Sequence, residues 1–198
     1  SDNFSDILFA VSDFSEANLR KENIRGKIMK VGNTVVDSSW IAYKKANKKL
    51  KYKKNSYTLV NIHRHENLVS KKRMGKIIHI LEQIKTNVIW PLHDNTRHHL
   101  EKYGFMDKVL SMKNIQITEL TDYPNFISLI ANCKYLVTDG GSIQEESLVF
   151  KKPCLILRKR TERQEGLSTG INFLTKLNVE YSKEVISNIE GGKIVAKK

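Results

Sequence analysis

The chain has 198 residues, of which 40% are hydrophobic, 28% charged and 8% aromatic, a composition typical of a globular domain with a core of ordinary size. Ten glycines and three prolines exclude collagen-like and proline-rich chains, and no apolar run approaches the roughly 20 residues that cross a bilayer. Lysine and arginine outnumber the acidic residues by 34 to 21, which gives a net charge of +13 and directs attention to anionic ligands.

The first 38 residues differ in pattern from the rest of the chain. They predict two strands, at 6–11 and 27–31, on either side of a helix at 14–22, before Gly32-Asn33-Thr34 breaks the pattern. We expect residues 1–38 to be the end of a preceding domain and the passage that leaves it, and residues 39–198 to form the main domain. A start at Ser1 rather than Met indicates an excised piece.

From residue 35 onward, helical patterns alternate with short apolar runs, which predicts βαβ units and an α/β fold with a parallel sheet covered by helices on both faces. The predicted strands are 57–63, 87–93, 114–118, 134–139 and 153–158. The predicted helices are 35 to 50, 71–85, 96–103, 124–132, 142–150 and 183–189. Residues 190–193, with two glycines, are expected to fray.

The basic excess is concentrated in short runs rather than spread along the chain. These runs are 44–54, 71–73, 151–152 and 197–198. They lack the interleaved aromatic residues of a base-stacking surface, so we interpret them mainly as solvated faces and expect no nucleic-acid partner. An anionic small molecule is compatible with the same charge.

The two cysteines, Cys133 and Cys154, each lie in an apolar stretch, ANCKYLV and KPCLIL. This setting predicts buried, reduced thiols and a cytoplasmic location. The first residues also lack the basic and apolar segments of a secretory signal, so nothing in the sequence directs the chain to a membrane or out of the cell.

The most informative run, at 136–150, reads LVTDGGSIQEESLVF: an apolar strand, two glycines and a serine, then a helix. Consecutive glycines let the backbone turn sharply and approach a ligand, and a helix N-terminus favours negative charge, so this order is typical of phosphate binding. Ser142 could cap the helix or donate its hydroxyl to a phosphate. Glu145 and Glu146 could satisfy free helix N–H groups or accept from ribose hydroxyls. A glycine turn with a capping box is the alternative without a ligand.

Two other predicted strands end in histidine: one runs into His63-Arg64-His65 and the other ends at His93. Because the carboxyl ends of parallel strands share the edge where such sheets bind ligands, we expect these imidazoles near the glycines. His63 could instead be a half-buried structural histidine, and His65 an exposed one. A metal site from the three histidines is a further alternative, but no carboxylate or cysteine stands at a recognisable ligand spacing, so neither metal nor cofactor is predicted.

Arginines follow the last predicted strand, in the run RKRTERQE. Arg158 and Arg163 could neutralise a diphosphate, or they could pair with the neighbouring glutamates and order the loop.

Taken in order, these motifs resemble the C-terminal half of the UDP-N-acetylglucosamine 2-epimerase family. The matching motifs are HRxEN at 63–67, PxH at 91–93, DYxxF at 122–126, TDGGSxQEE at 138–146, KPxLxxRxxTERxE at 152–165 and GxN at 170–172. The resemblance covers residues 57–174, and GNTVVD at 32–37 resembles that family's passage between its two halves.

The resemblance implies a two-domain fold of the glycosyltransferase-B type, in which the C-terminal Rossmann-like half holds UDP and the sugar lies in the cleft. It implies contacts of the diphosphate with Gly140, Gly141 and Ser142, of the ribose with Glu146, and of the uracil with the Phe126 backbone. It further implies that His63 is catalytic near the leaving diphosphate and that the cleft is lined by Arg64, His93 and Arg163.

The implied reaction converts UDP-N-acetylglucosamine to UDP-N-acetylmannosamine by elimination and re-addition of UDP, or to free N-acetylmannosamine and UDP when water is added instead. The family's acid–base carboxylates belong to the N-terminal half, which is absent here, so we expect this chain alone to be inactive. The missing half is an expected partner, and a homodimer is one alternative for the assembly.

The sequence departs from the family pattern at three points. Gly140-Gly141-Ser142 reverses the usual order of serine before two glycines, Gln164 replaces a proline, and His65 replaces an arginine. A non-catalytic nucleotide-sugar binding module or a degenerate paralogue is therefore the main alternative. A glycosyltransferase of the same fold would need an acceptor site in the missing half, and polynucleotide binding would weaken steeply with salt.

Overall fold

The computed structural model describes residues 2–22, 24–46 and 52–194. Within these residues, six parallel strands form one sheet in the order β5-β4-β3-β6-β7-β8. The strands are β3 (Tyr57–Asn61), β4 (Asn87–Pro91), β5 (Ile115–Thr118), β6 (Tyr135–Thr138), β7 (Cys154–Ile156) and β8 (Asn172–Leu174). The central strand β3 pairs with β4 and β6. Its residues are all buried, as expected of a parallel strand covered on both sides.

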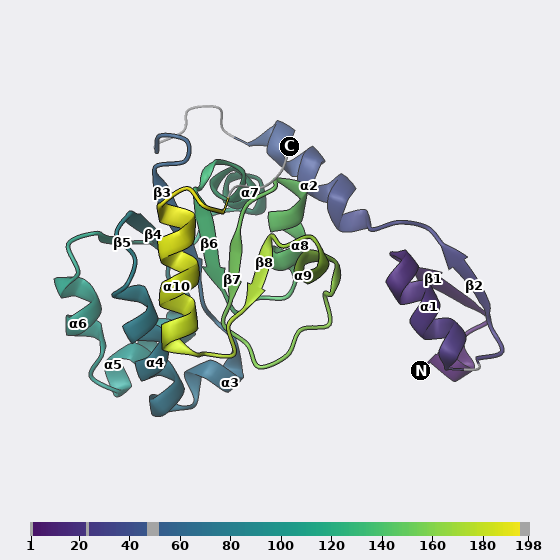
Figure 1. Ribbon diagram of the computed structural model, residues 1–198, viewed down its shortest axis with the longest axis horizontal. Coiled ribbons are helices and arrows are strands. Elements are labelled where there is room, and N and C mark those ends of the chain that lie inside the picture. The colour runs from purple at the N-terminus through teal and green to yellow at the C-terminus, as the bar shows by residue number, and fades with distance from the viewer. Residues whose placement is uncertain (1, 23, 47–51, 195–198) are drawn as a thin grey trace.

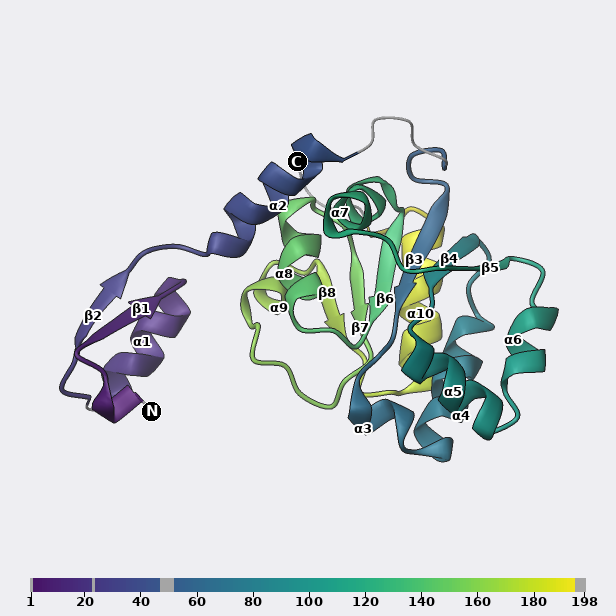
Figure 2. The ribbon, with the colours of Figure 1, turned by 180° about the vertical axis from the view of Figure 1, so that it is seen from behind.

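Helices cover both faces of this sheet, and the predicted α/β fold is confirmed (Figures 1 and 2). One face carries α4 (Lys71–Leu81), α5 (Asp94–Lys102), α6 (Met106–Ser111) and α10 (Val179–Glu190). The other face carries α2 (Thr34–Lys45), α7 (Tyr123–Asn132) and α8 (Ser142–Val149). Two short helices, α3 (His65–Leu68) and α9 (Glu165–Ser168), follow strands or loops at the sheet edge.

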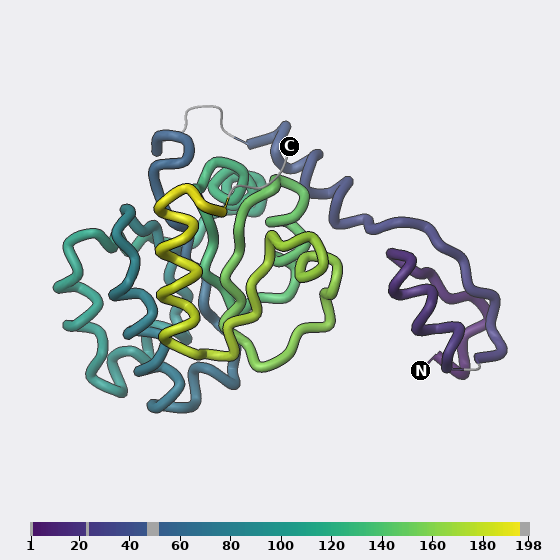
Figure 3. The backbone as a smooth tube through the Cα atoms, viewed as in Figure 1, coloured from purple at the N-terminus to yellow at the C-terminus, as the bar shows by residue number. Residues whose placement is uncertain are grey.

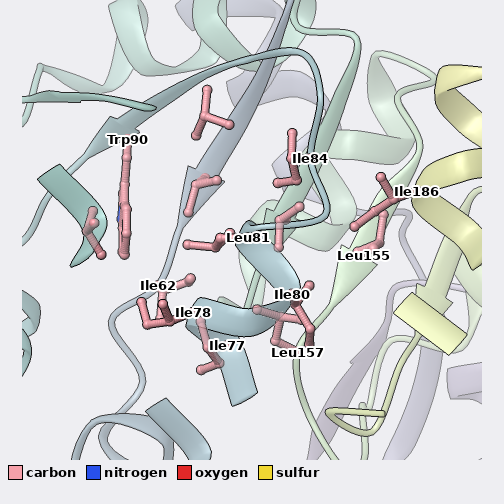
Figure 4. Close-up of a cluster of buried hydrophobic side chains, with 14 of the residues drawn as sticks. Ile62, Ile77, Ile78, Ile80, Leu81, Ile84, Trp90, Leu155, Leu157 and Ile186 are labelled. Atoms are coloured by element: carbon pink, nitrogen blue, oxygen red, sulfur yellow. The ribbon is translucent and has the colours of Figure 1, made fainter. Parts of the chain in front are cut away.

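The core is divided by the sheet into two layers. Along β3, Leu59 belongs to one buried cluster and Val60 to the other, because successive side chains of a strand point to opposite faces. Figure 4 shows part of the larger cluster, where Ile62, just after β3, lies near Ile77 and Ile78 from α4, and Trp90 from β4 belongs to the same cluster. The predicted apolar face of α4 is therefore the face that builds the core.

The N-terminal residues form a separate βαβ unit. It consists of the 3-10 helix Asp2–Phe4, β1 (Ile7–Ala10), α1 (Asp13–Lys21) and β2 (Lys27–Lys30), with β1 and β2 parallel. Figure 3 follows the single backbone connection from β2 into α2. Large apolar side chains of this unit are exposed, including Ile7, Phe9 and Met29. Because two parallel strands bury little surface by themselves, this unit has the character of one edge of a larger sheet.

Several predicted boundaries shift in the structure. The strand predicted at 57–63 ends at Asn61, although Ile62 is also fully buried. The strand β8 and the short helices α3, α6 and α9 were not predicted. The last helix begins at Val179, where the Asn178 side chain accepts from the Tyr181 N–H, rather than at 183. The helix predicted from 35 to 50 ends at Lys45, and residues 47–51 lie outside the described part of the chain.

The predicted fraying of residues 190–193 is wrong. The Lys193 and Ile194 N–H groups both donate to the Asn188 carbonyl, and Gly192 takes a φ of 76°, a left-handed conformation that favours glycine after a helix. Glu190 ties this end to the sheet, because its carboxylate accepts from the Lys85 and Thr86 N–H groups and from the Tyr135 hydroxyl.

The lysine runs are less uniform than predicted. Lys152 is buried, and its Nζ donates to Asn55 Oδ1 at 2.7 Å, so it is a structural residue rather than part of a solvated face. Arg73 also has buried nitrogens, and its Nη2 lies 3.6 Å from the Glu66 carboxylate. No helix in the described ranges is both long and apolar enough to cross a membrane.

Cys133 and Cys154 are free and buried, as predicted. Burial raises the pKa of the Cys133 thiol to about 12 and also raises that of Cys154, which keeps both thiols protonated and unreactive. We expect neither cysteine to react with iodoacetamide near neutral pH in the folded chain, and both to react after denaturation, as followed by mass spectrometry. A Ser111→Cys variant, with its exposed site, is the positive control. Rapid native labelling of either buried thiol would contradict this prediction.

Candidate functional site

The carboxyl ends of the central strands lie at one edge of the sheet, marked by α3 at the bottom of the main domain in Figure 1. His63 and Arg64 follow β3, His93 follows β4, and Gly140 and Gly141 follow β6. Residues 158–164, which include Arg158 and Arg163 and are called the arginine loop below, follow β7 at the same edge. The expectation that these motifs share one edge is therefore confirmed, although they come from four separate parts of the sequence.

Asp139 fixes the backbone at this edge. Its fully buried carboxylate accepts from the His63 N–H at 3.0 Å, from the Arg64 N–H at 3.1 Å and from Asn67 Nδ2 at 2.8 Å. These bonds join the ends of β3 and β6 and hold the His63 backbone in place. Sequence reasoning missed this role of Asp139. A carboxylate directly after a short strand rich in apolar residues was the signal that could have found it.

The imidazoles of His63 and His93 are neighbours, with ring centroids 4.9 Å apart. Burial lowers the pKa of His93, and the adjacent His63 lowers it further, while Asp139 and Asp94 oppose the shift. The shift favours the neutral form of His93. His65 is exposed at the start of α3, as favoured from the sequence, and His63 is exposed too, so the alternative of a half-buried His63 is wrong. The described ranges contain no group of three or more histidine, cysteine or acidic side chains placed to hold a metal ion.

Gly140 and Gly141 form the turn between β6 and α8, called the glycine loop below. Gly141 directly precedes Ser142, the first residue of α8. Ser142 is exposed and does not cap the helix, so the capping alternative is wrong. Neither glycine needs a left-handed backbone, because both lie outside the group of residues with positive φ. Space is tight at Gly140 instead: a Cβ there would stand 3.1 Å from Ile143 Cγ2 and 3.5 Å from His63 Nε2. The imidazole of His63 thus lies beside the loop.

Gln144 joins the glycine loop to the arginine loop. Its buried side chain donates to the Gly140 carbonyl at 2.6 Å and accepts from the Thr161 hydroxyl at 2.6 Å. Thr161 in turn accepts from the Arg163 N–H. Sequence reasoning also missed this link, because the two loops are separated by a complete strand.

Arginine and glutamate side chains pair with one another beside the glycine loop. Arg158 donates to Glu162 at 3.0 Å, Arg163 contacts both Glu162 and Glu145, and Glu145 accepts from Asn33 Nδ2 at 2.7 Å. Burial alone would raise the pKa of Glu162, but its hydrogen bonds and the two arginines outweigh this and lower it. Both arginines therefore order this loop, and Arg163 remains within reach of Gly141, whose Cβ would lie 3.8 Å from Arg163 Cζ.

Glu146 lies one turn inside α8 and is only 4% exposed. Its Oε1 accepts from the Tyr123 hydroxyl at 3.0 Å. Burial raises the pKa of Glu146 and the nearby Glu145 adds to the shift, whereas the bond from Tyr123 opposes it. Phe126 lies one turn beyond Tyr123 in α7 and packs, half-buried, against the smaller core cluster. The first turns of α7 and α8 thus meet beside the glycine loop.

A sequence profile described as UDP-N-acetylglucosamine 2-epimerase matches residues 1–192. The chain belongs to the UDP-N-acetylglucosamine 2-epimerase family. The epimerase of Methanocaldococcus jannaschii is 35% identical over 193 residues, covering 91% of this chain and 53% of that protein. An epimerase homologue of Methanococcus maripaludis is 34% identical, covering 94% of this chain and 54% of that protein. The chain therefore spans about half the length of the curated relatives it matches.

A solved structure extends this likeness to three dimensions. The crystal structure of the Methanocaldococcus jannaschii epimerase in complex with UDP-N-acetylglucosamine and UDP has a TM-score of 0.82 and 33% identity, covering 98% of this chain and 55% of that chain. The predicted fold class, an α/β domain corresponding to half of a glycosyltransferase-B type fold, is confirmed.

The three departures from the 2-epimerase pattern fall at points that the fold accommodates. Ser142 takes the first helical position of α8, so its hydroxyl remains at the loop although two residues later in the chain. Gln164 precedes α9 and donates to the Thr161 carbonyl at 2.6 Å, which closes the turn locally. His65 is exposed and leaves the Asp139 bonds to its neighbours intact.

Proposed function

We propose that this chain is the UDP-binding C-terminal domain of a UDP-N-acetylglucosamine 2-epimerase. The observation that carries this proposal is the glycine loop, where a helix N-terminus, an arginine and an imidazole surround one position beside a buried carboxylate. The first three groups suit the diphosphate of a nucleoside diphosphate, and the carboxylate suits its ribose. The family membership and the UDP complex of a relative support the same conclusion.

The diphosphate contacts the loop at Gly140, Gly141 and Ser142. The α8 N-terminus supplies free N–H groups and a partial positive charge, which favour a phosphate. Arg163 lies close to Gly141 and donates to Glu145. When the ligand binds, the guanidinium donates to its phosphate in place of this glutamate and so remains paired with an anion. Arg64 and His93 line the cleft next to it.

The nucleoside lies toward α7 and α8. Glu146, at the turn after the loop, accepts from the ribose hydroxyls, because a buried carboxylate has the acceptor oxygens that a diol needs. Phe126, in the first turns of α7, offers its backbone to the uracil edge.

His63 acts at the leaving diphosphate. Its backbone is fixed by Asp139, and its Nε2 lies beside Gly140. Elimination of UDP develops negative charge on the departing phosphate, and a donor aimed at that oxygen lowers the barrier. Re-addition with inverted C2 then gives the epimer, and addition of water gives the free sugar.

The whole protein requires a further N-terminal half, which supplies the acid–base carboxylates for C2. The exposed apolar side chains of β1 and β2 support this, because helices packed on the faces of a larger parallel sheet would cover them. The expected boundary between residues 38 and 39 falls inside α2, whose Ala42 is buried in the UDP domain. We therefore place the junction at Gly32, so that the residues before it belong with that half and its passage and those after it with the UDP domain. The free thiols support a cytoplasmic location.

Calorimetric titration of this chain with UDP, UDP-N-acetylglucosamine and AMP tests the proposal. We expect selective uridine nucleotide binding, and Glu146→Ala should weaken it about 10- to 100-fold, since hydrogen bonds to a charged group are lost. Glu184→Ala, an exposed carboxylate of α10, is the matched control and should bind as the unchanged chain does. Absence of binding by a folded chain, or equal binding of AMP, would contradict the proposed UDP site.

The alternative of a non-catalytic binding module shares this UDP site and differs only in the rest of the protein. The relocated Ser142 hydroxyl is the observation that favours it. Epimerase activity of the whole protein, measured as conversion of UDP-N-acetylglucosamine, separates the two.

A further inference from the structure

The Tyr123 hydroxyl is the one polar contact on Glu146 that has no place in the proposed function. Tyr123 is the first residue of α7 and is 43% exposed, so core packing does not explain its position. Its hydroxyl reaches across to α8 and donates to Glu146 Oε1 at 3.0 Å. The contact therefore joins an exposed phenol to a buried carboxylate.

Only one of the two carboxylate oxygens is used in this way. Among the hydrogen bonds of the described residues, Glu146 Oε2 receives no protein donor. Oε2 is also not one of the fully buried polar atoms that lack a hydrogen-bond partner. The last torsion of a glutamate is broad, so a carboxylate without a fixed donor rotates freely. A donor on Oε1 selects one orientation and leaves Oε2, with the second lone pair of Oε1, directed toward a ligand.

We propose that Tyr123 is a positioning residue that sets the preference of this site for ribonucleotides over 2′-deoxyribonucleotides. It does so by fixing the Glu146 carboxylate in the orientation that accepts two adjacent ribose hydroxyls. This inference rests on the proposed function, because it requires that Glu146 contacts the ribose. A 2′-deoxyribose offers one hydroxyl in place of two, so it gains less from an oriented carboxylate.

The charges around the pair agree with this role. The bond from Tyr123 favours the ionised form of Glu146, against burial and against the neighbouring Glu145. An ionised carboxylate is an acceptor on both oxygens, whereas a protonated one presents a donor to the diol. Loss of the phenol hydroxyl would therefore weaken the acceptor as well as free its rotation.

Tyr123→Phe tests the proposal because it removes only the hydroxyl oxygen. The UDP and dUDP affinities of the unchanged chain and the variant are compared by calorimetry, with circular dichroism confirming the fold. We expect the unchanged chain to prefer UDP over dUDP about 10-fold, and Tyr123→Phe to reduce that preference about fivefold, with dUDP affinity changed less than about twofold. Tyr181→Phe is the matched control, since Tyr181 is 41% exposed on the distant α10.

The outcomes separate the inference from the function on which it rests. If the folded chain fails to bind UDP, the proposed function is wrong and this inference falls with it. If the chain binds UDP and Tyr123→Phe keeps the UDP preference, the function stands and the positioning role is wrong. Equal losses of UDP and dUDP affinity would also overturn it, because they would show general support of the site rather than ribose selectivity.

A double-mutant cycle with Glu146→Gln adds a second check. Since Tyr123 acts through Glu146, the preference lost in Glu146→Gln should not fall further when Tyr123→Phe is added. Additive losses of UDP preference would show that Tyr123 contacts the ligand independently and would contradict the positioning role.

Discussion

Gly141→Asp is expected to abolish UDP binding while the chain stays folded. Gly141 has φ and ψ of −82° and −66°, which any residue adopts, and its Cβ would meet no atom closer than 3.7 Å. Aspartate is also a favoured residue immediately before a helix. The added carboxylate, however, would take the α8 N–H groups and the Arg163 guanidinium that we assign to the diphosphate. Like charges placed against each other cost several kcal/mol, so we expect a loss of more than about 100-fold.

Calorimetry with UDP measures this effect, and thermal unfolding verifies the fold. Gly141→Asn is the matched control, because it adds nearly the same volume without the charge and should keep most of the affinity. If Gly141→Asp binds UDP within about threefold of the unchanged chain, the diphosphate does not lie at this loop.

Asp139→Asn is expected to destabilise the domain by about 3 kcal/mol. The Asp139 carboxylate accepts from the His63 and Arg64 N–H groups and from Asn67, all at a fully buried position. An amide has the same shape but replaces one acceptor oxygen by a donor, which then faces another N–H group. Donors at that oxygen lose their partner and remain buried, and this costs more than the bond alone.

Urea unfolding followed by circular dichroism gives the measurement, with a lower midpoint at an unchanged slope as the expected result. Asp107→Asn makes the same chemical change at an exposed position of α6 and should alter stability by less than about 0.5 kcal/mol. A loss at Asp139 no larger than that of the control would show that the carboxylate does not hold the two strand ends together.

The elements of the fold that were predictable are those with a strong local signal. β4, β6 and β7 are short runs made mostly of apolar residues, and α4 has its apolar residues on one face. Strand boundaries were predicted wrongly where a residue is buried without pairing to a neighbouring strand. Ile62 is fully buried but follows the end of β3. The short edge strand β8 pairs only with β7, so three residues had to be recognised without a periodic pattern.

The placement of the candidate site residues at the ends of strands was predictable from the sequence. The hydrogen bonds that connect these residues were not. A histidine after β3 and glycines after β6 were expected to meet, and His63 indeed lies beside Gly140. The bonds of Asp139 and Glu146 were not expected, because their partners lie 76 and 23 residues away in the sequence. Such contacts depend on how strands and helices pack against one another, which local sequence patterns do not encode. The roles assigned to the site residues remain predictions.

Glu190 also has a consequence for the order in which the domain is completed during synthesis. The N–H groups of Lys85 and Thr86 lie at the start of β4, yet their acceptor is 105 and 104 residues further along the chain. A chain made from its N-terminus has β3, β4 and β6 long before it has this carboxylate. Until α10 has emerged, the Tyr135 hydroxyl lacks its acceptor and one face of the larger core cluster stays uncovered. The domain therefore closes only when nearly its last helical residue is present.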